Sequence, residues 1–392
     1  MTSRIDGEPD LHEEADRDSP MRSWRIITAL LALLAMVVIL LWVPVPFVVS
    51  SPGPTFNVLG SANGEPMIAI EGTDPTTGEE VQLDDAQSAS VTAKAKPGQG
   101  QLRMVTVSES GGPGNRLSFA QLLMAYFDSH SKIVDYESVY PSGTTYNEIS
   151  DAQSAMMRNS QTTSQVAALE YLGWDVPATV TIEGATEGSN ADGIVQQGDI
   201  LQAITTPDGT RHEITHASLP FTLMRTVPAG SHMTLTIERD GVVRDVSFDS
   251  IAASATDSGS KLGIYLSVTP ELPVDISFNL DGVGGPSAGM MFSLGIIDRL
   301  TPGDMTGGNA IAGTGTMSFD GQVGAIGGIQ QKMWGAHDDG AQWFLAPSDN
   351  CSEVVGHVPD GLSVVKVSNL SEAATAVATI AEGNGATLPT CQ

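Results

Sequence analysis

The stretch "LDGVGGPSAGMMFSLG", residues 280–295, places a serine between two glycines, immediately before an apolar run. Pro286 has the backbone angle of a first helical turn, and the glycines let another chain come close. Ser287 is therefore predicted at a helix N-terminus, where backbone N–H groups from Gly285 to Ala288 could hold an oxyanion. The pattern resembles a nucleophile elbow, but it also fits an ordinary capping or turn serine. The base that would activate Ser287 must be sought elsewhere in the chain.

Residues 310–350, "AIAGTGTMSFDGQVGAIGGIQQKMWGAHDDGAQWFLAPSDN", follow this serine. Together with "GGPSAGMM" they resemble the proteolytic domain of Lon proteases: a Gly-Pro-Ser-Ala-Gly nucleophile, a Thr-Gly strand, a "DGQVGAIGG" turn and a helix bearing a lysine. The whole chain is most similar to the membrane-anchored, PDZ-containing Lon-like proteases of bacteria, the YlbL family. This resemblance implies an α+β fold with a Lon proteolytic domain, which is like domain 2 of ribosomal protein S5, and an inserted PDZ domain.

The resemblance also implies the roles of individual residues. Ser287 would be the nucleophile, Lys332 the general base, and Thr314 the threonine that hydrogen-bonds the lysine amine, so that the enzyme is a serine endopeptidase with a Ser-Lys dyad. Gly285 and Ala288 would support the site, with no cofactor and no metal. Two positions depart from the family pattern: Gln330 stands where a first lysine is usual, and Thr316 where an acid is usual.

The chemistry of Lys332 is coherent without the resemblance. An exposed lysine is protonated near pH 7 and cannot accept a proton. Burial against "IGGI", Met333 and Trp334 would lower its pKa toward neutrality, so that Lys332 could deprotonate Ser287.

A histidine base is the rival interpretation, and it would make the protein a Ser-His-Asp esterase. His337 and His357 follow Ser287, and nearby aspartates could orient them. An α/β-hydrolase, however, needs several more strand–helix units and the order serine, acid, histidine. Only 105 residues follow Ser287. These histidines are therefore interpreted as surface residues.

The segment 174–250 has the order of elements of a bacterial PDZ domain. A strand "ATVTIEG" is followed by Gly198-Asp199 before "ILQAI", a short helix "SLPFTLMRTV", and a hairpin turning at Asp240-Gly241. The resemblance implies that an extended peptide binds beside the helix, next to Leu219, Leu223 and Val227. Two alternatives remain open: a module that only orients its neighbour, and a catalytically inactive membrane adaptor that binds peptide tails.

An apolar run near the N-terminus predicts a membrane anchor. Residues 26–43, "IITALLALLAMVVILLWV", carry no charge and would form a helix about 27 Å long. Arg22 and Arg25 precede the run, whereas the first basic residue after it is Lys94. The positive-inside rule then places the N-terminus in the cytoplasm and the rest outside the cell membrane. A cleaved signal peptide is the alternative, but no small-x-small cleavage site follows.

Composition restricts the partners. The chain has 18 Lys+Arg against 46 Asp+Glu, a formal net charge of -28, which excludes nucleic acid as an expected partner. No phosphate-loop motif occurs, so cleavage of unfolded or flexible proteins is expected without ATP. The two cysteines, Cys351 and Cys391, are expected to form a disulfide in an oxidising compartment.

The helix predicted at 147–171 resembles one that precedes the serine strand in Lon domains. Residues 100–172 are therefore expected to share one domain with residues 255–380, although the PDZ domain lies between them. The resemblance to ring-forming Lon domains leaves a homo-oligomer open. The predicted organisation is a disordered cytoplasmic tail (1–25), a transmembrane helix (26–49), the first part of the Lon-like domain (50–172), the PDZ domain (173–252), the Lon proteolytic domain with the dyad (255–382) and a tail (383–392).

Overall fold

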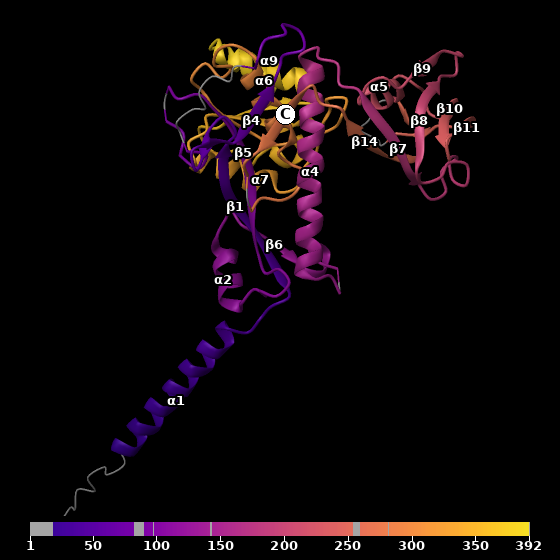
Figure 1. The fold of residues 1–392 in the computed structure, drawn as a ribbon. Coiled ribbons are helices and arrows are strands. Elements are labelled where there is room, and N and C mark those ends of the chain that lie inside the picture. The colour runs from indigo at the N-terminus through magenta and orange to yellow at the C-terminus, as the bar shows by residue number, and fades with distance from the viewer. Residues whose placement is uncertain are drawn as a thin grey trace, which may run out of the picture.

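The computed structural model describes residues 19–81, 90–96, 98–141, 143–253, 259–280 and 282–391. Most of the predicted cytoplasmic tail, residues 1–18, lies outside this part of the chain. A long helix leads from the N-terminus into two bodies, one at the centre of the view and one to its side (Figure 1). We call the central body the main domain and the other, residues 178–270, the side domain. Helices and strands mix in both, which confirms the predicted α+β class.

Helix α1 (Ser19–Leu41) projects away from both domains (Figure 1). Its 18-residue segment Trp24–Leu41 is apolar, and none of it is buried within the molecule. By length and composition this helix could cross a membrane. The predicted span 26–49 is wrong at its end, because the helix stops at Leu41 and the chain enters a strand at Phe47. Pro44 and Pro46 lie between them and cannot continue a helix.

The main domain is built on a six-stranded sheet that joins strands from both sides of the side domain in sequence. Three neighbouring strands in one half of the sheet come before the side domain in the sequence, and the three strands in the other half come after it. The order is β20 (Ser363–Val367), β19 (Trp343–Pro347), β16 (Ala310–Gly313), β5 (Gln101–Ser110), β1 (Phe47–Asn57) and β6 (Lys132–Asp135). Neighbours β16, β19 and β20 run parallel to each other, and β5 runs parallel to β16, whereas β1 is antiparallel to β5 and to β6.

Helices cover both faces of this sheet. One face packs against α4 (Tyr146–Tyr171), α6 (Gly289–Leu300) and α9 (Leu370–Ala381), and their apolar residues share one core with β5, β16 and β19. The other face packs against α7 (Ile329–Asp338), through Ile329, Met333 and Ala336. The residues before and after the side domain therefore form one continuous core, and α4 lies directly against α6.

The side domain has a sheet of its own, with strand order β11-β10-β8-β7-β14 and short helix α5 (Leu219–Met224) beside it. Its hairpin turns at Asp240 and Gly241, both with positive φ, as the sequence predicts. The strands are β7 (Ala178–Ala185), β8 (Asp199–Thr205), β10 (His232–Arg239), β11 (Val242–Asp249) and β14 (Ile264–Pro270).

Strand β14 reaches beyond the predicted boundary between the two domains. It pairs antiparallel with β7, from Ile264↔Ala185 to Pro270↔Ala178. Sheet pairing therefore extends the side domain past residue 252, where the sequence places its end. The reason is that β14 completes the sheet with a strand distant in sequence from β7, which periodicity alone does not reveal.

Two further links connect distant segments. Arg225, at the end of α5, forms an ion pair with Asp320 of the main domain, and the Phe221 and Phe319 rings stack with centroids 5.5 Å apart. Cys351 and Cys391 form a disulfide with an S–S distance of 2.03 Å, which ties the C-terminal segment to the short helix after β19.

Candidate active site

Ser287 lies in the loop that leads into α6, two residues before the first helical residue. Helix α4 holds this loop from one side. The Gly285 N–H donates to the Gln153 carbonyl at 3.0 Å, and Ser160 Oγ donates to the Pro286 carbonyl at 3.0 Å. Gly285 has φ +87°, a conformation that favours glycine. The loop geometry at Ser287 therefore depends on a helix more than 100 residues earlier in the chain.

Small side chains allow this close approach of α4 and α6. Ser164 Oγ donates to the Gly289 carbonyl at 2.9 Å, and Ser293 Oγ donates to the Ser164 carbonyl at 3.3 Å. A Cβ at Gly289 would lie 2.8 Å from Met317 Cβ and 3.0 Å from Ser160 Oγ, closer than packed atoms normally approach. Glycine at position 289 thus meets a packing requirement as well as the family motif.

Lys332 is brought to the serine by α7. The helix is preceded by Gly328 with φ +71°, where a Cβ would meet Val107 of β5 at 2.8 Å. One turn after Lys332, Gly335 packs against the backbone of Gly53 in β1, where a Cβ would lie 2.7 Å from the carbonyl oxygen. These two contacts fix α7 against the sheet and direct the Lys332 side chain inward.

The two side chains meet within hydrogen-bonding distance. Lys332 Nζ donates to Ser287 Oγ at 2.8 Å and to Thr314 Oγ1 at 3.1 Å. Thr314 Oγ1 in turn donates to the Ser287 carbonyl at 3.0 Å. Thr314 thus orients the amine and fixes the serine backbone at the same time.

Burial changes the acid–base character of Lys332. Its side chain is 3% exposed, and in the described part of the chain it has no ion-pair partner. Burial lowers the pKa of Lys332 to about 7, because an ammonium loses its hydration in the protein interior. An amine with this pKa is substantially neutral at physiological pH and can accept a proton from the adjacent hydroxyl.

A groove of about 340 Å³ opens onto the Ser287 and Lys332 side chains. One of its walls is β5. Only residues 101–104 of β5 pair with β16, so from Val105 onward this edge has no strand partner among the described residues. Its lining consists of Pro54, Phe56, Met104, Val105, Thr106, Val107, Ser108, Met157, Gly282, Val283, Gly284, Ser287, Ala288 and Lys332.

The other predicted site residues of the main domain have mixed outcomes. The expectation that Gly285 offers an oxyanion donor is wrong, because its N–H already donates to Gln153; its positive φ shapes the turn instead. Ala288 lines the groove beside Ser287. His337 pairs with Asp338, and His357 contacts the Val355 carbonyl, so the structure brings neither histidine to Ser287. Within the described ranges, no group of three or more His, Cys, Asp or Glu side chains is placed to bind a metal.

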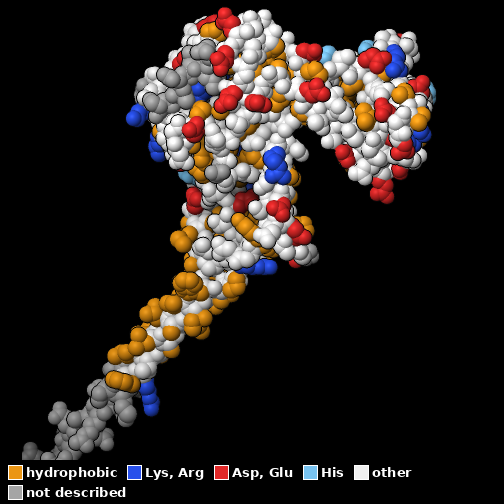
Figure 2. Space-filling model, viewed as in Figure 1, with side chains coloured by type: hydrophobic (Ala, Val, Ile, Leu, Met, Phe, Trp, Pro, Cys, Tyr) orange, Lys and Arg blue, Asp and Glu red, His pale blue; other side chains and the backbone are white. Residues whose placement is uncertain are grey.

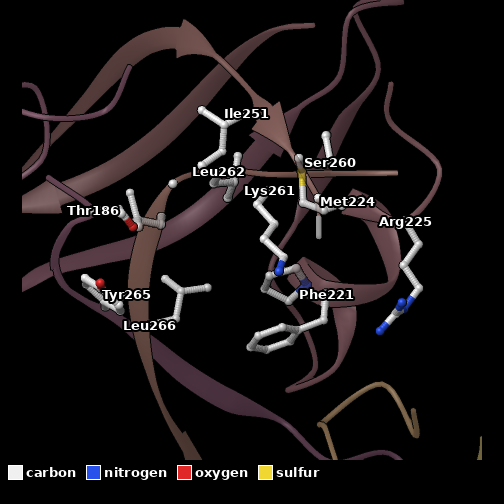
Figure 3. A pocket seen from close by; sticks show the side chains of 14 residues that line it. Thr186, Phe221, Met224, Arg225, Ile251, Ser260, Lys261, Leu262, Tyr265 and Leu266 are labelled. Carbon is white, nitrogen blue, oxygen red and sulfur yellow. The ribbon is translucent and has the colours of Figure 1, made fainter. Parts of the chain in front are cut away.

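A second groove, of about 330 Å³, lies in the side domain between α5 and β14. Figure 3 shows Phe221 and Met224 of α5 on one side and Tyr265 and Leu266 of β14 on the other. Ser260 Oγ is buried there without a hydrogen-bond partner among the described residues.

The predicted peptide contacts Leu219, Leu223 and Val227 do not line this groove, so they stay a prediction. Val227 and Leu223 pack in the core of the side domain instead. The adjacent face of the helix, with Phe221 and Met224, borders the groove. A six-residue helix is too short for its periodicity to show in advance which face borders a groove.

The sequence predicted the helix α4 but not which of its residues hold the Ser287 loop. Gln153, Ser160 and Ser164 are polar residues of an otherwise unremarkable helix, and their partners lie far away in sequence. The one available signal was the spacing of small residues at positions 160, 164 and 168, which places them on one helical face.

Residues 233–379 match the family model of the Lon protease (S16) C-terminal proteolytic domain. The chain is 29% identical over 140 residues to the Lon protease of Buchnera aphidicola subsp. Schizaphis graminum (strain Sg), covering 34% of this chain and 18% of that protein. It is 32% identical over 103 residues to Lon protease 2 of Bacillus subtilis (strain 168), covering 25% and 18%. The chain thus spans about a fifth of the length of the Lon proteases that it matches.

Among solved structures, the PDZ domain of the SdrC-like protein from Listeria innocua is similar, with 16% identity and a TM-score of 0.20. That match covers 22% of this chain and 92% of the other. Ser287, Thr314 and Lys332 all lie within the residues that match the family model. This chain therefore contains a proteolytic domain of the Lon type.

Proposed function

We propose that the protein is a membrane-anchored serine endopeptidase in which Ser287 is the nucleophile and Lys332 the general base. What supports this above all is the 2.8 Å hydrogen bond between Lys332 Nζ and Ser287 Oγ at a site that lowers the lysine pKa to about 7. A hydroxyl is a weak nucleophile at neutral pH unless an adjacent base removes its proton. A buried amine without a carboxylate partner is suited to that task.

The reaction has two halves. Neutral Lys332 takes the Ser287 proton while Oγ attacks the carbonyl carbon of the substrate, and the N–H groups of Ser287 and Ala288 would stabilise the oxyanion. The Lys332 ammonium then protonates the departing amine, the C–N bond breaks, and an acyl-enzyme remains. In the second half Lys332 deprotonates a water molecule that attacks the ester, and Ser287 recovers its proton when the new carboxylic acid leaves.

The substrate binds, in this proposal, as an extended strand along the free edge of β5. Residues 105–108 line the groove next to the dyad, and no strand of the described part of the chain pairs with them on that side. A strand added there would place its backbone carbonyl beside Ser287. Folded proteins cannot offer an extended segment, so the expected substrates are unfolded or flexible proteins, cleaved without ATP.

The remaining parts have supporting roles in this proposal. Residues 50–172 and 271–382 together form the proteolytic domain, and α1 anchors it in the cell membrane with the N-terminus in the cytoplasm, so that the substrates are extracytoplasmic. The side domain is a PDZ domain that captures an extended peptide between α5 and β14. The buried Ser260 Oγ in that groove has no hydrogen-bond partner among the described residues, and a bound peptide would supply one.

Cleavage of casein by the full chain in detergent micelles tests the proposal. Ser287→Ala and Lys332→Ala are each expected to lower kcat by at least about 10³-fold, because the two groups act as one unit. Ser363→Ala and Lys366→Ala are matched controls, since both residues are exposed on β20, and they should leave the rate unchanged.

An adaptor without catalytic activity is the second candidate, supported by the side-domain groove. It would prevail if the wild-type chain left casein intact but bound peptides in a manner sensitive to Phe221→Ala. Equal cleavage by wild type and Ser287→Ala would instead show that the activity comes from a contaminant or another site. Stimulation of the pure wild-type protein by ATP would contradict ATP-independent cleavage.

A further inference from the structure

Helix α2 (Phe119–Phe127) exposes an unusual amount of apolar surface. Its sequence, "FAQLLMAYF", contains no charged residue, and only Ala125 is fully buried. The exposed side chains include two phenylalanines, a tyrosine, a leucine and a methionine: Phe119 (42% exposed), Leu123 (42%), Met124 (66%), Tyr126 (72%) and Phe127 (78%). We call these five residues the α2 face. Contiguous exposed apolar surface of this kind marks an interaction site.

The opposite side of α2 is already used. Ala125 and Leu122 pack in a small core with Leu117, Val49 and Ile133, so the helix is fixed on β1 and β6. A capping box at Ser118 and Gln121 fixes its first turn. The side of α2 that packs on the main domain is therefore already occupied. The α2 face needs a partner other than the described residues.

The position of α2 is tied to the end of α1 by backbone hydrogen bonds. The Phe119 N–H donates to the Val43 carbonyl at 2.9 Å, and the Val45 N–H donates to the Leu117 carbonyl at 2.8 Å. Val43 is only two residues beyond Leu41, the last residue of α1. Figure 2 shows apolar side chains continuing from α1 to the base of the main domain. The α2 face therefore lies beside the C-terminal end of α1.

We propose that the α2 face lies in the headgroup region of the membrane that α1 crosses; this rests on the membrane anchorage proposed above. If the apolar part of α1 fills the bilayer core, the hydrogen bonds at Val43 leave α2 at the bilayer surface. Aromatic side chains such as Tyr126 and the 79% exposed Trp42 favour that interface. Because the helix carries no charge, neutral phospholipid is a sufficient partner.

This contact would set the orientation of the active site relative to the membrane. The loop between α2 and β6 touches the helix that carries Lys332: the His130 ring stacks on Trp334 with centroids 3.8 Å apart, and Gln331 Nε2 donates to the His130 carbonyl at 3.3 Å. A main domain resting on α2 cannot tumble freely about the end of α1. The groove then faces one fixed direction, which favours polypeptide segments that emerge close to the membrane.

The test uses the full chain in phosphatidylcholine proteoliposomes. Phe127→Cys and, as a matched control, Val242→Cys are each labelled with an environment-sensitive fluorophore. Val242 is a 56% exposed apolar residue at the start of β11, and β11 lies far from α1 (Figure 1). The label at position 127 is expected to emit at shorter wavelength and to lose fluorescence when lipids brominated near the headgroup are included. The label at position 242 should show neither change. An unchanged tryptophan emission spectrum verifies that both variants are folded.

Three other outcomes would overturn the inference. If carbonate extracts the chain from the vesicles, the anchorage itself fails and the inference fails with it. If the chain resists extraction but the label at position 127 behaves like that at 242, the anchorage stands and only the lipid contact is refuted. If the emission shifts without quenching by brominated lipid, and energy transfer occurs between differently labelled copies, the α2 face binds a second copy of the chain.

Discussion

Asp199 in the side domain and Lys332 in the main domain are both almost completely buried, at 1% and 3% exposure, but their surroundings differ. The Asp199 carboxylate accepts two hydrogen bonds of 2.6 Å from Arg239 and one of 2.9 Å from the Gln196 N–H. Among the described residues, Lys332 hydrogen-bonds two hydroxyls, those of Ser287 and Thr314. One buried group faces an opposite charge, and the other does not.

The consequence appears in their pKa values. Burial opposes ionisation of Asp199, but the hydrogen bonds from Arg239 and Gln196 outweigh it, so the pKa of Asp199 lies below its usual value and the carboxylate stays charged. Nothing offsets the burial of Lys332, and its pKa falls to about 7. A paired buried charge serves the fold, whereas an unpaired one acquires a pKa suited to catalysis.

The largest expected effect is a gain of stability on removing the amine. The pKa of Lys332 falls from 10.5 in the unfolded chain to about 7, which corresponds to about 5 kcal/mol at 1.4 kcal/mol per unit. Loss of two hydrogen bonds offsets part of this, so Lys332→Met should raise the free energy of unfolding by about 4 kcal/mol at pH 6.

The sign of this effect follows from proton linkage. Below pH 7 the folded protein must keep a buried ammonium, so the burial penalty is fully present; it disappears as the pH rises toward 10.5. Denaturant unfolding followed by fluorescence of Trp334 and Trp343 would measure it, with Lys366→Met as the exposed control. A destabilised Lys332→Met variant at pH 6 would contradict the comparison.

The matching substitution in the side domain should lower the free energy of unfolding instead of raising it. Arg239→Met leaves the Asp199 carboxylate buried without its cation, which should destabilise the side domain by about 3 kcal/mol. Hydrogen exchange of the β10 amides, followed by mass spectrometry, would report this locally. The exposed Arg211–Glu213 pair is the control, and Arg211→Met should cost less than about 1 kcal/mol. Equal effects of the two substitutions would show that burial of the pair does not matter.

The pH dependence of cleavage sharpens the comparison further. The base must be neutral, so kcat/KM should rise about tenfold per unit well below pH 7 and level off above it, a change of about 50-fold between pH 5 and 7. In the wild type, Thr314 Oγ1 lies 3.1 Å from Lys332 Nζ. Thr314→Asp would therefore place a carboxylate next to the amine and raise the pKa of Lys332. The rise should then move to higher pH. A variant with an unshifted profile would argue against Lys332 as the base.

The smallest expected effect concerns the helix that holds the serine loop. Ser160→Ala removes the hydrogen bond to the Pro286 carbonyl and should lower kcat about tenfold, with KM and the pH profile unchanged. Thr162→Ala is the control, because in the described part of the chain the Thr162 hydroxyl donates within α4, to the Arg158 carbonyl. A change in KM alone would mean that Ser160 affects substrate binding rather than the position of Ser287.

Local patterns predicted much of this molecule. The α4 helix, the hairpin at Asp240-Gly241 and the apolar N-terminal helix depend on neighbouring residues, so periodicity and turn chemistry were sufficient. The groove-facing side of α5 and the pairing of β14 with β7 were not predictable in this way. Both depend on contacts between segments that are distant in sequence, for which a single sequence carries no periodic signal.

The sequence by itself determined the chemical groups: a serine in a glycine-rich turn, a threonine and a lysine in a Lon-like order. Only the tertiary structure decided what those groups can do. The pKa of Lys332 depends on the packing of α7 against β1 and β5, and the position of Ser287 depends on α4. The physical reason is that hydration and geometry are properties of the folded surroundings, whereas residue type alone fixes only the ordinary pKa.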